Sequence, residues 1–276
     1  MDTAKPISIN LSEVIRTRLG SRSRYVPGFV VRYMERLICQ DKLNELLRVN
    51  YPRRGADFCK GVLEHLDVSL TVRGAENLPA NSRVMVVSNH PLGGLDGMAM
   101  IAWLSEHYGV PARFVVNDLL MAIEPLRESF IPVNKHGSQS RSYAGALDNA
   151  LAGNDPVVIY PAGLCSRMGK GGVIADTTWH KMFVCKAIES KRDIVPVFFE
   201  GRNSQSFYRS AQWRKRLGIK FNFEMILLPR EVFRAAGSTF TLTVGKAIHW
   251  QQLRGGRDAA AQALEIRNKV YALRDK

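Results

Sequence analysis

The chain has 276 residues, of which 46% are hydrophobic and 23% are charged, a composition that excludes wholesale disorder and allows one large packed domain with an appendage. Its net charge of +14 is unevenly distributed: residues 1–66 contribute +5, residues 67–200 contribute −1 and residues 201–276 contribute +10. A basic flank suits nucleic acid, an acidic protein or an anionic lipid surface, and charge alone does not choose among these partners.

Targeting signals and metal-binding patterns are missing from the sequence. The first residues lack a basic segment followed by an apolar core, and no apolar run approaches the roughly 18–20 residues that a spanning helix needs. We therefore expect a cytoplasmic protein that neither crosses a membrane nor carries a recognisable export signal. The four cysteines have no C-x-x-C pairing and no metal-ligand spacing with histidine, so we expect reduced thiols and no bound metal.

The first segment, residues 1–66, has the pattern of amphipathic helices. Between Leu11 and Leu66, apolar side chains recur at spacings of three and four, and arginines fill the opposite positions. Pro52 interrupts this pattern, which predicts an N-terminal layer of two to four helices. The layer either packs on the rest of the protein or docks on a membrane, and both interpretations stay open.

The second segment, residues 67–276, alternates short apolar runs with helical patterns. The runs predict strands over residues 68–72, 84–87, 113–116, 130–133, 157–160, 194–199 and 240–244. The helical patterns predict helices over residues 98–103, 118–126, 138–151, 176–188 and 257–273, the fourth of them capped by Asp176. Because strands that alternate with helices pair in parallel, we expect an α/β domain whose mainly parallel central sheet is flanked by helices.

The strand predicted at residues 84–87 leads into the loop with the most distinctive chemistry. Asn89 and His90 follow the strand, a loop with two consecutive glycines comes next, and Asp96 lies at or near the cap of the following helix. In open α/β sheets, ligands bind outside the carboxyl ends of the strands. A histidine paired with a carboxylate can remove a proton near neutrality. The alternative is that His90 is an ordinary loop histidine and that Asp96 only caps its helix.

Three further blocks follow in order: Ser-Phe-Ile-Pro-Val-Asn-Lys at residues 129–135, Tyr-Pro-Ala-Gly-Leu-Cys-Ser-Arg at residues 160–167 and Ile-Val-Pro-Val at residues 194–197. Together the four blocks resemble those of the glycerolipid acyltransferase family, typified by the 1-acylglycerol-3-phosphate O-acyltransferases, over roughly residues 67–200. The chain departs from the family pattern in three places. Five residues instead of four separate His90 from Asp96, Lys135 stands where the family has arginine, and Ala162 replaces a glutamate.

The resemblance implies an enzyme that transfers a fatty acyl chain from a thioester to the hydroxyl of a single-chain lipid. His90 would be the general base, and Asp96 would orient it and stabilise its charged form, without a cofactor. The acyl donor would be acyl carrier protein or acyl-coenzyme A. The substrates would bind to the remaining motif residues, which are Asn89, Gly93, Gly94, Asn134, Lys135, Tyr160, Pro161, Gly163, Ser166 and Arg167.

The departures from the family pattern bear on the acceptor. Lysine lacks the fork with which arginine holds a phosphate, so Lys135 and Ala162 together argue against a glycerol-phosphate head group. The longer Pro-Leu-Gly-Gly-Leu loop resembles that of the branch that O-acylates amino-acid lipids, whose acceptor is an N-(3-hydroxyacyl) amino acid. Lys135 or Arg167 would bind the carboxylate of such an acceptor. Lysophosphatidic acid remains the alternative.

A basic and aromatic cluster in the last segment suggests contact with a membrane. The cluster consists of Phe207, Tyr208, Arg209, Trp213, Arg214, Lys215, Arg216 and Leu217. Aromatic rings favour head-group depth and cations favour anionic lipid, so we expect peripheral attachment to the inner face of the membrane. A solvated helix face is the alternative for this cluster.

Other functions remain open for the whole chain. A non-catalytic lipid- or carrier-binding membrane protein could keep this fold while the altered motif spacing and the missing glutamate reflect a lost activity. An acyl thioesterase would use water in place of the lipid hydroxyl. We expect no nucleic-acid partner, because the motif blocks favour lipid among the ligands that a basic protein can bind.

Overall fold

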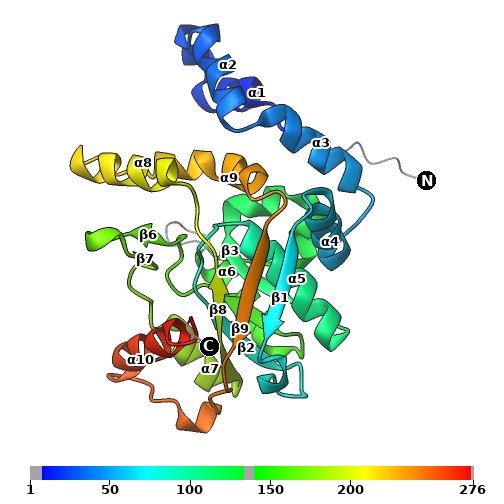
Figure 1. The fold of residues 1–276 in the computed structure, drawn as a ribbon, viewed down its shortest axis with the longest axis vertical. Coiled ribbons are helices and arrows are strands. Elements are labelled where there is room, and N and C mark those ends of the chain that lie inside the picture. Colours follow the sequence, from blue (N-terminus) through cyan, green and yellow to red (C-terminus); the bar gives the residue numbers. More distant parts are fainter. Residues whose placement is uncertain (1–7, 134–139, 275–276) are drawn as a thin grey trace.

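The structure is a computed structural model that describes residues 8–133 and 140–274. Its first part contains four α-helices, within the predicted number: α1 (Leu11–Leu19), α2 (Gly28–Leu37), α3 (Gln40–Asn50) and α4 (Gly55–His65). Helix α1 begins where the Asn10 side chain accepts a hydrogen bond from the Glu13 N–H, which satisfies one free amide of the first turn. Helices α1 to α3 form an arm that projects from the body of the protein, whereas α4 joins the body (Figure 1).

The central sheet has seven strands in the order β1-β9-β8-β2-β5-β3-β4. Their bounds are β1 (Ser69–Arg73), β2 (Val84–Ser88), β3 (Arg113–Asn117), β4 (Phe130–Val133), β5 (Val157–Ile159), β8 (Asp193–Glu200) and β9 (Thr239–Val244). Neighbouring strands are parallel except for β8 and β9, which are antiparallel. The predicted α/β fold with a mainly parallel central sheet is confirmed.

Helices cover both faces of this sheet, and each face has its own hydrophobic core. Successive side chains of a strand point to opposite faces, so Val86 enters the core with α4 and α5 (Leu95–Tyr108), while Met85 enters the other. The helices of the second core are α6 (Ser140–Ala152), α7 (Met182–Ser190) and α10 (Ala259–Tyr271). Every residue of β2 is buried as a result, which explains its uninterrupted apolar sequence.

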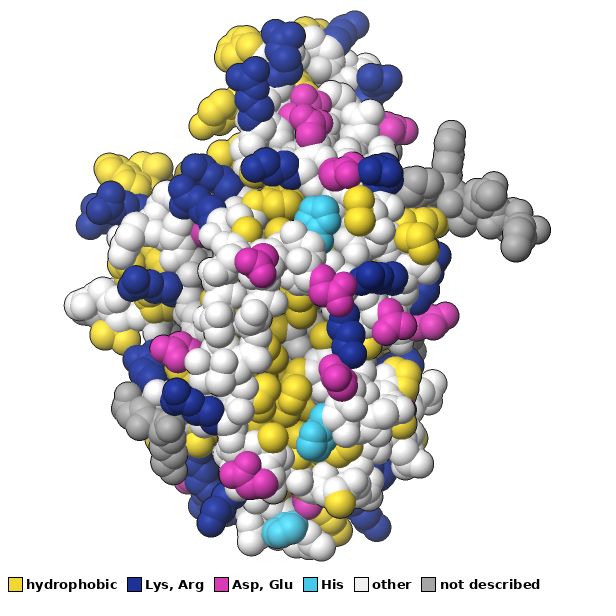
Figure 2. Space-filling model, turned by 45° about the vertical axis from the view of Figure 1, so that its right-hand side comes forward, with side chains coloured by type: hydrophobic (Ala, Val, Ile, Leu, Met, Phe, Trp, Pro, Cys, Tyr) yellow, Lys and Arg dark blue, Asp and Glu magenta, His cyan; other side chains and the backbone are white. Residues whose placement is uncertain are grey.

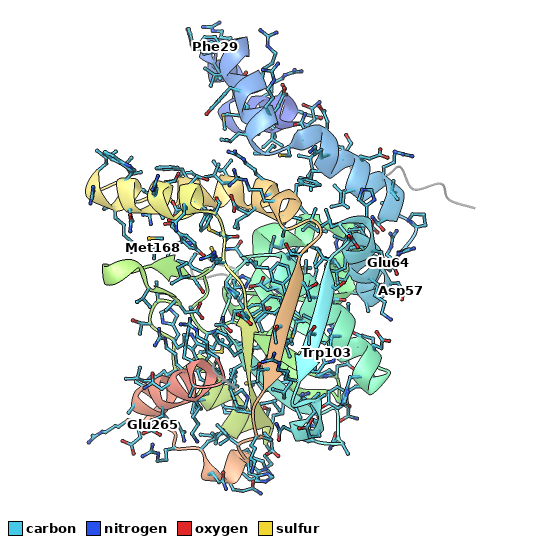
Figure 3. The ribbon with its side chains drawn as sticks, viewed as in Figure 1. Phe29, Asp57, Glu64, Trp103, Met168 and Glu265 are labelled. Atoms are coloured by element: carbon cyan, nitrogen blue, oxygen red, sulfur yellow. The ribbon has the colours of Figure 1, made fainter. Side chains whose placement is uncertain are left out.

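Two helices follow the carboxyl end of β8, and the sequence indicated only the first of them, as the alternative of a solvated helix face. Helices α8 (Gln205–Arg216) and α9 (Leu228–Arg234) lie across this end of the strand, and Ser204 caps α8 by accepting a hydrogen bond from the Phe207 N–H (Figure 1). A short hairpin of β6 (Arg167–Met168) and β7 (Ile174–Ala175) lies beside α8, where Figure 3 labels Met168. These elements surround the loop that follows β2.

Two predicted helices differ from the structure. Residues 118–126 form two 3₁₀ helices, η3 (Asp118–Ala122) and η4 (Glu124–Ser129), because Pro125 lacks the N–H that a continuous α-helix would need. The prediction that Asp176 caps a helix was wrong, since α7 begins only at Met182. The other 3₁₀ helices are η1 (Gly20–Tyr25), η2 (Ala75–Asn77), η5 (Lys170–Gly172), η6 (Phe223–Leu227) and η7 (Trp250–Gln252).

The arm and the body meet at α4. This helix belongs to the predicted first segment, residues 1–66, but its Phe58 and Val62 lie in the same core as α5. The predicted division into residues 1–66 and 67–276 stays a prediction. Within the described ranges, each helix is too short or too polar to span a lipid bilayer.

Candidate active site

Asn89 anchors the loop that leaves β2. Its side-chain amide donates a hydrogen bond to the Phe199 carbonyl at 2.8 Å, and its oxygen accepts one from the Phe199 N–H at 2.8 Å. This pair of bonds extends the parallel contact between β2 and β8 past the end of β2. Strand β8 thus occupies the polar groups of this buried side chain, and the role of Asn89 in substrate binding stays a prediction.

His90 and Asp96 are in direct contact. Nδ1 of His90 lies 2.9 Å from Oδ2 of Asp96, and the two side chains are 17% and 0% exposed. The same carboxylate accepts three backbone N–H groups: that of Leu92 at 3.1 Å, that of Gly94 at 3.1 Å and that of Gly97 at 3.0 Å. The five-residue loop therefore wraps around the Asp96 carboxylate, and its extra residue does not separate the pair.

Gly93 is the position where this wrapping requires glycine. Its φ of +78° lies in the left-handed region, and a Cβ there would be 3.0 Å from Leu228 Cδ2 and 3.1 Å from Cys165 Cβ. Gly94 has a φ of −175° and contributes its N–H to Asp96. Both predicted substrate-binding glycines thus shape the loop.

The electrostatics of the pair favour a basic histidine. Burial alone would lower the pKa of His90, but the charge of Asp96, the hydrogen bond to it and the charge of Asp176 outweigh burial and raise this pKa. Burial opposes ionisation of Asp96, yet His90 and the backbone N–H groups hold its pKa below the ordinary value. An ionised Asp96 only accepts hydrogen bonds, so neutral His90 carries its proton on Nδ1 and presents the lone pair of Nε2.

The block at residues 160–167 packs against His90. The Tyr160 ring stacks on the imidazole with centroids 4.0 Å apart and planes inclined by 19°. The buried Tyr160 hydroxyl has no hydrogen-bond partner among the described residues, and burial raises its pKa. Gly163 has a positive φ and donates its N–H to the Tyr160 carbonyl at 2.9 Å, and the Pro161 carbonyl accepts the His180 N–H at 3.1 Å. This turn fixes the ring over His90.

A second carboxylate, Asp176, meets the backbone of His90. Its Oδ1 accepts the His90 N–H at 3.2 Å and the Ser166 hydroxyl at 2.6 Å, while the Ser166 N–H donates to the His90 carbonyl at 2.7 Å. Ser166, predicted to bind substrate, thus holds the loop. Sequence reasoning missed this contact of Asp176 because His90 lies 86 residues earlier in the chain. An isolated aspartate after a hairpin carries no local signal for such a contact.

Arg167 is engaged with a buried carboxylate. It is buried, donates to Glu224 at 3.0 Å, and also contacts the carbonyl of Cys165 at 3.2 Å and its sulfur at 2.8 Å. Arg214 donates to the other oxygen of Glu224 at 2.8 Å. Both guanidinium groups are therefore engaged with one buried carboxylate, so neither is a free surface cation, and the roles predicted for Arg167 and Arg214 stay predictions.

The rest of the predicted cluster divides into a buried and an exposed part. Phe207 and Tyr208 belong to a small core with Cys165, whereas Trp213 and Leu217 are exposed. Two predicted substrate-binding residues, Asn134 and Lys135, lie outside the described residues. Among the described residues, the His, Cys, Asp and Glu side chains nowhere gather in threes as a metal site would need. The expectation of no metal stays a prediction.

Comparisons with known proteins place the chain in a family. The acyltransferase family model matches residues 13–276. A lyso-glycine lipid O-acyltransferase of Phocaeicola vulgatus is 43% identical over 96% of this chain and 95% of its own length. A protein of the same name from Bacteroides thetaiotaomicron is 40% identical over 96% of this chain and 97% of its own length.

A solved structure is also similar to the chain. The 1-acyl-sn-glycerophosphate (LPA) acyltransferase PlsC from Thermotoga maritima is 12% identical, covers 96% of both chains and has a TM-score of 0.46. The family match spans nearly the whole sequence, and two relatives share at least 40% of their residues with it. The chain therefore belongs to the acyltransferase family.

Proposed function

We propose that this protein transfers a fatty acyl chain from a thioester to the hydroxyl of a lysolipid, with His90 as the general base. The observation that carries this proposal is the 2.9 Å contact between His90 and the fully buried Asp96, in a loop at the carboxyl end of a central parallel strand. The names of the two relatives described above support an acceptor of the lysolipid class.

The proposed reaction uses the free nitrogen of His90. The acceptor hydroxyl gives its proton to Nε2 while its oxygen bonds to the thioester carbonyl carbon. The carbon–sulfur bond then breaks, and the sulfur leaves as a thiol after it takes the proton from the imidazolium. Asp96 stabilises the imidazolium in between. General base catalysis contributes about 10²- to 10⁴-fold, and holding both lipids in register contributes the rest.

A lyso-glycine lipid is the acceptor that we favour. Both relatives carry this name, and the chain lacks the glutamate of the family's third block, where Ala162 is buried. Arg167 is engaged with Glu224, so the acceptor carboxylate needs another partner, for which Lys135 stays a candidate. Lysophosphatidic acid is the competing acceptor.

An acidic acyl donor fits the charge of the chain. Residues 201–276 carry a net charge of +10, and the exposed cations of α8 include Arg209, Lys215 and Arg216. Acyl carrier protein and acyl-coenzyme A are both strongly anionic, so a basic surface accelerates their encounter with the site. This advantage falls as salt concentration rises.

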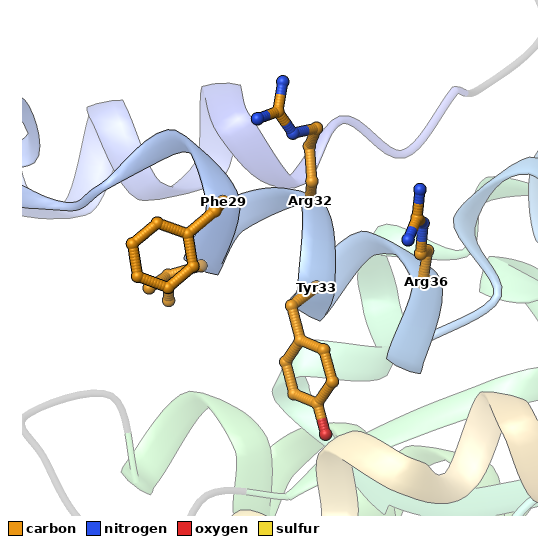
Figure 4. A pocket seen from close by; sticks show the side chains of 5 residues that line it. Phe29, Arg32, Tyr33 and Arg36 are labelled. Atoms are coloured by element: carbon orange, nitrogen blue, oxygen red, sulfur yellow. The ribbon is translucent and has the colours of Figure 1, made fainter.

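Peripheral attachment to an anionic membrane fits two exposed surfaces. On α2, Phe29 and Tyr33 are 69% and 65% exposed and line a hollow of about 420 Å³ together with Val30, Arg32 and Arg36. Figure 4 shows the two aromatic rings on one side of α2 and the two arginines on the other. Figure 2 shows Lys and Arg side chains beside apolar ones on the arm.

The end of α8 forms the second surface. Trp213 is 60% and Leu217 is 66% exposed, next to the exposed cations Lys215 and Arg216. Aromatic rings at head-group depth and cations over anionic lipid are the two contributions that bind a peripheral protein. We propose that the inner face of the membrane is the surface that both regions meet.

A direct assay tests the function. Purified protein receives a radiolabelled acyl thioester together with an N-(3-hydroxyacyl) glycine or with lysophosphatidic acid, and the labelled lipid product is quantified. We expect product with the glycine lipid at a rate well above that with lysophosphatidic acid. Preference for lysophosphatidic acid would contradict the proposed acceptor. Release of free fatty acid at an undiminished rate in the presence of acceptor would identify a thioesterase, and no turnover of any thioester would identify a binding protein.

A further inference from the structure

His90 is held by carboxylates on two sides. Asp96 contacts the imidazole ring through Nδ1, whereas Asp176 accepts the backbone N–H of His90 at 3.2 Å. Asp176 is bonded to Ser166, which in turn donates its own N–H to the His90 carbonyl at 2.7 Å. The Asp176–Ser166 pair therefore fixes the peptide groups on both sides of the His90 Cα, while Asp96 and the stacked Tyr160 fix the ring.

The Asp176 carboxylate has only neutral donors as hydrogen-bond partners among the described residues. These are the Ser166 hydroxyl at 2.6 Å, the Trp179 indole N–H at 2.9 Å and the His90 N–H. The residue is 5% exposed, so water screens its charge poorly. Burial raises the pKa of Asp176, and the hydrogen bonds from Ser166, Trp179 and His90 counteract this. An ionised Asp176 thus places a second negative charge near His90.

Helix α10 holds the backbone of Asp176. The Asp176 N–H donates to the Tyr271 hydroxyl oxygen at 2.7 Å, and Arg267 donates to the Asp176 carbonyl at 2.9 Å. The Arg267 guanidinium in turn lies 4.7 Å from the centre of the Tyr271 ring. The last helix of the chain thereby connects to the loop after β2 through a single residue.

We propose that Asp176 is a positioning residue for His90, and that α10 holds it in place through Tyr271 and Arg267. This inference rests on the proposed role of His90 as the general base. Asp176 has two effects on that base: it fixes the backbone from which the imidazole extends, and its charge favours the imidazolium that forms when the acceptor hydroxyl is deprotonated.

The charged and titratable groups around His90 determine the pH response. Asp96 on α5 and Asp176 both raise the pKa of His90, Arg167 on β6 lowers it, and Tyr160 stacks on its ring. Around Asp176, Tyr271 and Arg267 come from α10, and burial raises the pKa of Tyr271 to about 12, so that it stays neutral. Removing the charge of Asp176 therefore lowers the pKa of His90 without changing another partner of the ring.

The test compares Asp176→Asn with a matched control, Asp193→Asn. Asp193 also contacts a histidine and a backbone N–H, but in an exposed pair with His249. We expect Asp176→Asn to lower kcat by about 10- to 100-fold, because small misplacements of a catalytic group have effects of that size. We also expect the acid limb of its pH profile to move to lower pH, with KM for the thioester little changed and Asp193→Asn like wild type.

A second variant separates position from charge. Tyr271→Phe removes the acceptor of the Asp176 N–H but leaves the Asp176 charge in place, so kcat should fall while the acid limb stays where it is. If Asp176→Asn does not fold, as judged by circular dichroism, Tyr271→Phe decides the question alone. A wild-type kcat in Tyr271→Phe, or a wild-type kcat and pH profile in a folded Asp176→Asn, would overturn the inference.

His90→Ala distinguishes this inference from the proposed function. If His90→Ala keeps the activity of wild type, the general base has been misassigned and the proposed function fails. If His90→Ala is inactive while Asp176→Asn matches wild type, only the role of Asp176 fails.

Discussion

Within the part of the chain that the structure describes, two histidine–aspartate pairs have the same contact distance. In each pair, Nδ1 of the histidine lies 2.9 Å from Oδ2 of the aspartate, and each aspartate also accepts a backbone N–H. The pairs occupy opposite ends of the sheet: His90 follows the carboxyl end of β2, whereas Asp193 begins β8 beside Val84, the first residue of β2.

The two pairs differ in their surroundings. His90 and Asp96 are 17% and 0% exposed, but His249 and Asp193 are 66% and 23% exposed. Water screens the exposed pair, so its mutual attraction is small. The buried pair has an aromatic ring over the imidazole, three backbone N–H groups on the carboxylate and a second carboxylate nearby. The contact distance is therefore the same in both pairs, and burial and the surrounding hydrogen bonds are what set the His90 pair apart.

The aspartates provide the largest expected contrast. Asp96→Asn removes the negative charge and replaces one of two accepting oxygens with an NH2 donor, so we expect acyl transfer to fall by about 10²- to 10⁴-fold, the range of general base catalysis. Asp193→Asn should stay within about twofold of wild type, since surface pairs contribute little. Initial rates of labelled product measure both, and equal losses in the two variants would remove the distinction between the pairs.

The same contrast between a buried and an exposed group exists on α8, where Arg214 is buried and its neighbour Lys215 is exposed. Arg214 is 9% and Glu224 0% exposed, so Arg214→Ala should reduce the free energy of unfolding by roughly 1.5–3 kcal/mol, the range for one lost hydrogen bond to a charged group, because Arg167 still pairs with Glu224. Lys215→Ala should leave stability unchanged but weaken binding to anionic liposomes by about 1 kcal/mol at low salt. Urea unfolding and liposome sedimentation measure the two effects. Weaker liposome binding by a fully folded Arg214→Ala, with Lys215→Ala unaffected, would reverse this assignment.

A smaller effect on stability is expected in the loop around Asp96. There, two glycine substitutions distinguish the strain of a positive φ from the crowding of a new side chain. Gly93 and Gly109 both have positive φ, of +78° and +66°, but only at Gly93 would a Cβ meet neighbouring side chains. Gly93→Ala should therefore lower the free energy of unfolding by roughly 1–3 kcal/mol more than Gly109→Ala does, the range for overpacking. Its activity should fall as well, since the loop carries His90. Equal stabilities of the two variants would show that Leu228 and Cys165 move aside.

The pH dependence of wild type follows from the raised pKa of His90. The general base must be neutral before it accepts the hydroxyl proton, so kcat/KM should fall as pH decreases through that pKa, at a pH above the ordinary histidine value of about 6.5. In Asp96→Asn the residual activity should decline at a lower pH, because the charge and the hydrogen bond that raise the pKa are gone. An acid limb at the same pH in both proteins would contradict the coupling.

The same pair also affects stability in a defined pH window. The pKa of His90 is raised by folding, so its contribution is complete below the ordinary histidine value and is lost as pH rises through the raised value. The pKa of Asp96 is lowered by folding, so its contribution is present above the ordinary aspartate value and is lost as pH falls through the lowered one. Between these limits the pair stabilises the folded protein.

Short-range patterns in the sequence were enough to predict the strands and the loop that holds His90 and Asp96. Apolar runs such as Val84 to Val87 predicted the strands because a parallel sheet buries both of its faces. The spacing of His90 and Asp96 between a strand and a helix located the loop. Neither required knowledge of distant contacts.

The sequence did not show side-chain contacts between residues that belong to different elements. Arg167 and Arg214 looked like free cations, but Glu224 lies 57 residues after the first and 10 after the second. Asp176 looked like a helix cap, although its side chain bonds to His90, 86 residues earlier. Charge counts and local periodicity contain no information on which buried carboxylate folds onto which donor.

The most direct measurement of the central claim compares the two histidines. His90→Ala and His249→Ala are assayed side by side for transfer of a labelled acyl chain from a thioester to an N-(3-hydroxyacyl) glycine, with circular dichroism as a check on folding. The buried pair is proposed to supply the base, so His90→Ala should lose about 10²- to 10⁴-fold in rate while His249→Ala stays within about twofold of wild type. A folded His90→Ala that forms product at the wild-type rate would contradict the account.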